Sequence, residues 1–105
     1  MEIAKEFVQS QIGKFPVVTF TKSFCPHSQK VKKLFTENNI AFQDFQIDGR
    51  PDMNFMQDAL EQMTGARTVP RVFVGGKFIG GGDDTVKLFN DGTLQPLLKA
   101  TSQGA

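Results

Sequence analysis

Residues 15–35 read FPVVTFTKSFCPHSQKVKKLF, and this stretch decides the fold. Its first part, Phe15–Phe20, is a short apolar run, which predicts a strand buried on both faces. In its second part, Val31, Leu34 and Phe35 fall on one stripe of a helix. A buried strand that leads into an amphipathic helix is typical of an α/β protein, in which helices cover the faces of a sheet.

Other segments extend this pattern on both sides. The predicted elements are a helix over residues 4–12 that Gly13 stops, a second strand at Phe45–Ile47, a helix that Pro51-Asp52 opens and Gly65 closes, a hairpin over residues 72–79 with Gly75-Gly76 at its turn, a helix that Asp83-Asp84 cap, and a last short turn at residues 93–98. This order predicts an α/β sandwich with a mixed sheet. The early strands should run parallel and the hairpin antiparallel.

Length and composition restrict the function classes. One hundred and five residues fit a single domain spanning residues 1–105. Twelve basic and eleven acidic residues give a net charge of +1, which argues against a basic nucleic-acid surface. The apolar runs are far shorter than the ~20 residues that span a bilayer, and the first residues lack the apolar segment of a signal peptide. We therefore expect a cytoplasmic protein with no nucleic-acid or membrane partner.

Cys25 is the candidate reactive residue. It is the only cysteine, so the chain forms no internal disulfide, and with one histidine it completes no four-ligand zinc site; no metal is expected. Its place between the strand and Pro26 puts it at a helix N-terminus, where free N–H groups and the helix dipole favour a thiolate. Lys22 and His27 add positive charge nearby. These features predict a nucleophile with a lowered pKa rather than a buried structural cysteine.

Three segments of the chain together resemble the glutaredoxins. Lys22-Ser23-Phe24-Cys25-Pro26-His27-Ser28 is similar to the active-site loop of that family, Thr64-Gly65-Ala66-Arg67-Thr68-Val69-Pro70 to its second signature, and Gly80-Gly81-Gly82-Asp83-Asp84 to its third. The resemblance implies a thioredoxin-like fold, with a four-stranded mixed sheet flanked by helices. It also implies a glutathione-dependent thiol–disulfide oxidoreductase acting in redox homeostasis and electron transport, with glutathione as co-substrate and glutathionylated proteins as partners of a monomer.

The resemblance further implies a groove that holds glutathione beside the Cys25 sulfur. The residues that match the family's glutathione positions are Lys22, Cys25, His27, Gln57, Arg67, Thr68, Val69, Pro70, Gly81, Gly82, Asp83 and Asp84. Lys22, Gln57 and Arg67 match the positions that hold the glycine carboxylate, for which cationic and amide donors are suited.

The other two parts of this groove have their own chemistry. Thr68-Val69-Pro70 resembles the family's cis-proline loop, in which the Val69 backbone pairs with the cysteinyl unit of glutathione. Asp83 and Asp84 match the clamp on the γ-glutamyl end, whose ammonium group requires a carboxylate and whose carboxylate can take N–H groups from a helix start. Both aspartates also suit helix caps, and the two roles are compatible.

Ser28 stands where the family usually has a second, resolving cysteine. A hydroxyl cannot attack the mixed disulfide at Cys25, so the resemblance implies deglutathionylation by a monothiol route. Ser28 fits either a native serine or a replaced cysteine. His27 stands where an aromatic residue is more common, and its imidazole is expected to stabilise the thiolate. The predicted catalytic residues are Cys25, His27 and Ser28.

Two other functions stay open at this point. Some single-cysteine glutaredoxins bind an iron–sulfur cluster between two protomers, but they typically carry Gly-Phe after the cysteine and a Trp-Pro pair, whereas this chain has Pro26-His27 and no Trp. A non-catalytic binding module would use the fold only as an interaction surface. The complete set of matched glutathione positions argues against that function.

Overall fold

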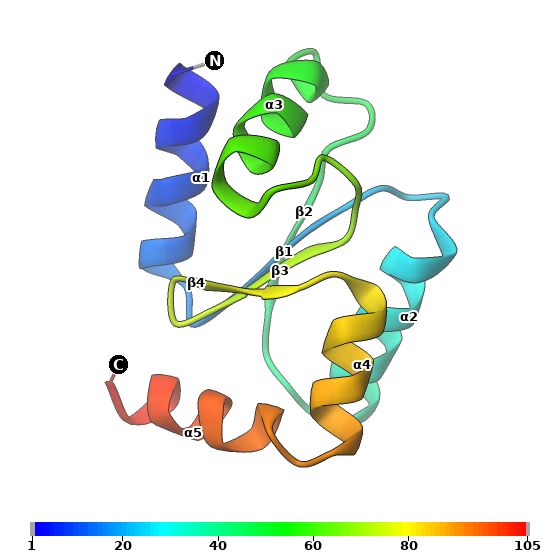
Figure 1. The fold of residues 1–105 in the computed structure, drawn as a ribbon, viewed down its shortest axis with the longest axis vertical. Coiled ribbons are helices and arrows are strands. Elements are labelled where there is room, and N and C mark those ends of the chain that lie inside the picture. The colour runs from blue at the N-terminus through cyan, green and yellow to red at the C-terminus, as the bar shows by residue number, and fades with distance from the viewer. Residues whose placement is uncertain (1, 105) are drawn as a thin grey trace.

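The structure is a computed structural model that describes residues 2–104, with side chains described over residues 3–100. The chain folds, in order, into α1 (Glu2–Lys14), β1 (Val17–Thr21), α2 (Pro26–Glu37), β2 (Gln43–Gln46), α3 (Met53–Thr64), β3 (Arg71–Val74), β4 (Lys77–Gly80), α4 (Gly82–Asn90) and α5 (Leu94–Gly104) (Figure 1). Helices and strands alternate through the first half, as the sequence predicts.

The four strands form one mixed sheet in the order β2-β1-β3-β4. β1 runs parallel to β2, with Thr21 opposite Gln46, and antiparallel to β3; β3 and β4 form the hairpin. The predicted mixed sheet is therefore confirmed. At the hairpin turn Gly75 and Gly76 have φ values of 61° and 81°, the left-handed backbone that a two-residue turn of this kind requires.

Two apolar layers enclose the sheet, and β1 is buried along its whole length. Because side chains alternate along a strand, Val18 and Phe20 join the core beneath α1 and α3, whereas Val17 joins the core beneath α2, α4 and α5. Figure 1 shows α1 and α3 on one side of the sheet and α2 and α4 on the other. Each fully buried side chain of this size stabilises the fold by about 1.5–3 kcal/mol.

Two helix boundaries differ from the prediction. α1 continues through Gly13 to Lys14, so the glycine lies inside the last turn instead of stopping the helix. α3 begins at Met53, after the predicted start at Pro51-Asp52. The Asp52 carboxylate does not cap the helix, because it accepts hydrogen bonds from Arg50 at 2.8 and 3.1 Å.

The C-terminal part also departs from the prediction. Gly81 is the N-cap residue of α4, and Asp83 and Asp84 lie in its first turn, where the Asp84 carboxylate caps the helix by accepting the Gly81 N–H. The predicted short turn at residues 93–98 is instead the start of α5, an 11-residue helix. Pro96 is tolerated there because it lies in the first turn, where backbone N–H groups have no partner within the helix. Buried Leu94 attaches this end to the core.

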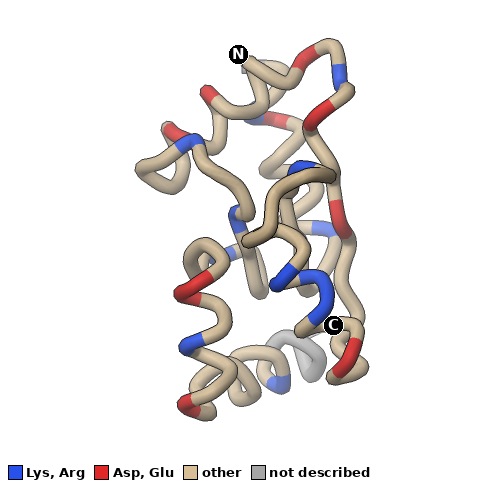
Figure 2. Tube along the Cα trace, turned by 90° about the vertical axis from the view of Figure 1, so that its right-hand side faces the viewer, with Lys and Arg blue, Asp and Glu red and all other residues tan. Residues whose placement is uncertain are grey.

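Charged residues of both signs are spread along the chain (Figure 2). Within residues 2–104, none of the helices has the length and apolar character needed to cross a membrane.

Candidate active site

Cys25 lies at the junction between β1 and α2, as predicted. It is the residue that precedes the helix, with extended backbone angles of φ −90° and ψ 119°, and Pro26 follows it in the first turn. Its N–H donates to the Lys22 carbonyl at 3.3 Å, and its carbonyl accepts from the Gln29 N–H at 3.0 Å. The partly buried thiol therefore sits at the positive end of α2.

The surroundings of the thiol favour its ionised form. Burial alone would raise the pKa of the Cys25 thiol, but the hydroxyl of Ser28 opposes it, followed by the backbone N–H groups of Ser28 and His27 and by the charge of Lys22. The net effect lowers the pKa of the Cys25 thiol from its ordinary value. A lowered pKa raises the thiolate fraction at neutral pH, and the thiolate is the nucleophile.

Ser28 is fully buried in the first turn of α2. Its hydroxyl oxygen accepts a hydrogen bond from the Lys22 N–H at 3.3 Å. The hydroxyl is thereby tied to the loop that precedes Cys25 while it also serves the thiolate. Ser28 thus supports the nucleophile without offering a second thiol.

The second predicted segment lies against the thiol. The Cys25 S–H group donates to the Val69 carbonyl at 3.6 Å, and the Val69–Pro70 peptide bond is cis, as the resemblance implied. Arg71, which the sequence analysis did not single out, holds the loop of residues 68–70 in place. Its guanidinium donates to the Pro70 carbonyl at 3.2 Å and to the Thr68 hydroxyl at 3.1 Å.

The structure brings Gln57 and Arg67 together. The Gln57 amide donates to the Arg67 carbonyl at 3.2 Å. The Arg67 guanidinium is itself paired with acidic side chains of α3, with Nη1 2.5 Å from Asp58 Oδ1 and 3.5 Å from Glu61 Oε1. The side chain predicted to hold the glycine carboxylate of glutathione is therefore paired with carboxylates of its own chain.

The third predicted segment lies next to His27. A Cβ atom at Gly82 would come within 3.1 Å of the His27 Cβ, so the glycine allows the starts of α2 and α4 to approach closely. Asp83 Oδ1 lies 3.9 Å from His27 Nδ1 and 3.0 Å from Lys30 Nζ. The hydrogen bond from Lys30 is the main cause of a lowered pKa at Asp83. His27 thus directs its imidazole toward Asp83 and its backbone N–H toward the thiol.

Gly81 connects the second and third segments. A Cβ atom there would lie 3.2 Å from the Arg71 guanidinium and 3.4 Å from the Pro70 carbonyl. The Gly81 N–H donates to the Asp84 carboxylate at 3.5 Å. Glycine at this position therefore keeps the start of α4 close to the loop that touches Cys25.

Asp48, which sequence reasoning also missed, holds the active-site loop. The Asp48 carboxylate accepts hydrogen bonds from both the N–H and the hydroxyl of Ser23. A signal was available, because the carboxyl ends of parallel neighbouring strands meet at the same edge of a sheet. Asp48 follows β2, and Ser23 follows β1.

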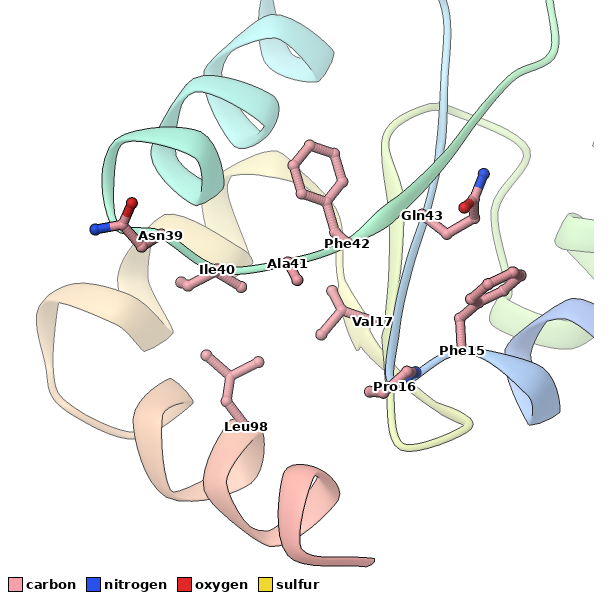
Figure 3. A pocket seen from close by; sticks show the side chains of 9 residues that line it. All are labelled: Phe15, Pro16, Val17, Asn39, Ile40, Ala41, Phe42, Gln43 and Leu98. Atoms are coloured by element: carbon pink, nitrogen blue, oxygen red, sulfur yellow. The ribbon is translucent and has the colours of Figure 1, made fainter. Parts of the chain in front are cut away.

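A pocket of about 460 Å³ opens at the other end of β1 and has no part in this site (Figure 3). Its lining is Phe15, Pro16, Val17, Asn39, Ile40, Ala41, Phe42, Gln43 and Leu98. The lining includes no nucleophile and no charged group. Among the residues that the structure describes, no three His, Cys, Asp or Glu side chains are grouped to hold a metal ion.

Comparison with known proteins points to one family. The glutaredoxin family model matches residues 17–79. The chain is 49% identical to glutaredoxin-C6 of Oryza sativa subsp. japonica over 105 residues, covering 100% of this chain and 90% of the relative. It is 43% identical to glutaredoxin-C2 of Arabidopsis thaliana, covering 100% of this chain and 89% of the relative. The crystal structure of the buckwheat glutaredoxin–glutathione complex superposes with a TM-score of 0.93 at 39% identity, covering 96% of this chain and 92% of that one.

Proposed function

The chain belongs to the glutaredoxin family and has its thioredoxin-like fold, and from that premise we propose that it removes glutathione from protein–glutathione mixed disulfides by a monothiol route. A thiol oxidoreductase role follows from the family. The observation that carries the finer proposal is the setting of Cys25, at the start of α2, with its thiol pKa lowered by Ser28, backbone N–H groups and Lys22.

The reaction takes two exchange steps. In the first, the Cys25 thiolate attacks the glutathione sulfur of the mixed disulfide, which forms the Cys25–glutathione disulfide and releases the substrate thiolate. In the second, a glutathione thiolate attacks that glutathione sulfur, which yields oxidised glutathione and regenerates the Cys25 thiolate. Each turnover thus oxidises one free glutathione, which leaves as oxidised glutathione together with the glutathione taken from the substrate, and no residue other than Cys25 changes its redox state.

Glutathione fits the charges around the thiol. At one side, Arg67 and Gln57 offer donors for the glycine carboxylate, once Arg67 exchanges its contact with Asp58 for the ligand. At the other, Asp83 offers a carboxylate for the γ-glutamyl ammonium group. Between them the Val69 backbone lies in contact with the Cys25 sulfur. The solved buckwheat complex contains glutathione, which favours this function over the iron–sulfur alternative.

The substrate protein would approach over the loop around Cys25. Phe24 is 94% exposed, and Pro26 and His27 are exposed beside it. An open, partly apolar rim suits a protein thiol that must enter and leave without being enclosed. Glutathionylated proteins as substrates, a monomeric state and a cytoplasmic location remain predictions.

Mass spectrometry after incubation with oxidised glutathione tests the proposal. We expect one added glutathione, removed by reductant, and no adduct in Cys25→Ser. Ser28→Cys is the matched variant, because its new thiol should expel the glutathione and leave an internal disulfide. A covalent dimer as the main wild-type product, with no glutathione adduct, would refute the proposed groove.

A further inference from the structure

We propose that Asp48 is a positioning residue for the nucleophile, which it serves by fixing Ser23 and with it the loop of residues 22–25. The sequence separates Asp48 from Ser23 by 25 residues. Neither residue belongs to the predicted set of catalytic or glutathione-binding side chains. The inference goes beyond the proposed function, since it concerns how the thiolate is held ready and not which disulfide it attacks.

Every polar group of Ser23 is held by a side chain. Its N–H donates to Asp48 Oδ1 at 3.0 Å, and its hydroxyl donates to Asp48 Oδ2. Its carbonyl accepts from the Gln29 amide at 2.7 Å. Gln29 belongs to the first turn of α2, where its N–H bonds to the Cys25 carbonyl. The loop is therefore fastened on one side to the β2–α3 connection and on the other to the helix.

The sheet places Asp48 opposite Ser23. β1 and β2 run parallel, and the Ile47 N–H donates to the Thr21 carbonyl at 2.8 Å just beyond their last paired residues. Both segments leave the sheet side by side, so the residue after Ile47 meets the loop after Thr21. Ile47 is fully buried and anchors this exit to the core. Asp48 thus stands on a rigid support, which a positioning residue requires.

Lys22 links the contacts of Ser23 to those of the Cys25 thiol. Lys22, its direct neighbour, donates its N–H to the Ser28 hydroxyl and accepts the Cys25 N–H. If Ser23 were released, Lys22 would move with it, and both the orientation of the buried Ser28 hydroxyl and the place of the lysine charge would change. The setting that favours the thiolate depends in this way on a carboxylate of another loop.

The negative charge of Asp48 and its positioning contacts with Ser23 have opposite effects on the pKa of the Cys25 thiol. The Ser23 hydroxyl is the main cause that keeps the pKa of Asp48 below its ordinary value, and Lys22 contributes to the same shift. Lys22 is also the cation that favours the Cys25 thiolate, with Ser28 and His27 as the other groups that face the thiol. By charge alone, loss of the carboxylate would therefore lower the thiol pKa, whereas loss of the positioning contact would raise it.

The rate of alkylation by iodoacetamide, measured against pH, separates these two effects, because its midpoint reports the thiol pKa. We expect Asp48→Ala to raise the midpoint by roughly half to one pH unit, the equivalent of one hydrogen bond. In Asp48→Asn the amide oxygen can still accept the Ser23 N–H, and the amide NH2 group can donate to the Ser23 hydroxyl. Its alkylation midpoint should therefore lie nearer to that of wild type than to that of Asp48→Ala. Asp44→Ala is the matched control, since Asp44 bonds to Thr19 and Thr21 within the sheet and to Lys32 of α2, and not to the loop. It should leave the midpoint within a few tenths of a unit.

An Asp48→Ala midpoint at or below that of wild type would overturn the proposal, as would an Asp48→Asn midpoint as high as that of Asp48→Ala. If Asp48→Ala does not fold, Ser23→Ala decides the matter: it removes only the hydroxyl contact and should raise the midpoint by a smaller amount, and an unchanged midpoint would count against the proposal. Alkylation needs no glutathione. Failure of wild type to form the glutathione adduct would therefore affect only the proposed function.

Discussion

Ser28→Ala removes the hydroxyl that contributes most to the lowered pKa of the Cys25 thiol. A hydrogen bond to a charged group is worth about 1.5–3 kcal/mol. Cys25 is partly exposed, so water replaces part of this contact. We therefore expect the lower end of the range, a rise in the thiol pKa of about one unit, or ~1.4 kcal/mol. The midpoint of alkylation rate against pH measures this shift directly.

The same change should appear in the stability of the fold. The thiol pKa is lower in the folded than in the unfolded state, so its contribution is present above the unfolded value of about 8.5 and is lost as the pH falls through the folded pKa. In urea unfolding under reducing conditions, the gain in unfolding free energy between low and high pH should be ~1.4 kcal/mol smaller in Ser28→Ala than in wild type. When Cys25→Ala is added to both wild type and Ser28→Ala, the two proteins should show the same gain in unfolding free energy between low and high pH. Equal midpoints and equal gains would refute the role given to Ser28.

Three further predictions concern the surroundings of the thiol. Arg67→Ala should raise the KM for glutathione roughly tenfold without slowing alkylation. Asp58→Asn should lower that KM, because it frees the Arg67 guanidinium. The same KM in both variants would contradict the assignment of Arg67 to the glycine carboxylate. His27→Phe should shift the thiol midpoint by less than about 0.3 units, since its backbone N–H is retained and its imidazole faces Asp83; a large rise would restore the role first given to the imidazole. Phe24→Ser should raise the KM several-fold for a glutathionylated protein but not for a small mixed disulfide. Equal effects on both substrates would place Phe24 in the glutathione site instead.

The elements that were predicted correctly are those whose signals lie in adjacent residues of the chain. Gly75-Gly76 between two apolar runs identified the hairpin, and Pro26 after an apolar strand identified the start of α2. α5 was predicted too short, as a turn over residues 93–98, whereas the helix continues to Gly104 and a proline in its first turn costs little. The attachment that stabilises α5 is the burial of Leu94, which depends on tertiary packing.

The candidate site could be predicted where its residues are close to one another in the sequence. Cys25, Pro26 and Ser28 share one turn, and their relation follows from their spacing. The contact between Asp48 and Ser23 joins two loops that only the sheet brings together. Long side chains of opposite charge have many possible partners, which is why the pairing of Arg67 with Asp58 could not be predicted from the sequence.

A chain whose only thiol is its reactive atom has a simple oxidation chemistry. Titration of free thiols in this protein counts working active sites directly, because Cys25 is the only cysteine in 105 residues. Peroxide would convert that thiolate to a sulfenic acid and, with further exposure, to irreversible sulfinic and sulfonic acids. A dithiol relative can protect itself by closing an internal disulfide, but the hydroxyl of Ser28 cannot do so. Under the proposed function, glutathione would protect Cys25 as well as regenerate it, and we expect the Cys25–glutathione mixed disulfide to be the form that accumulates under oxidative stress.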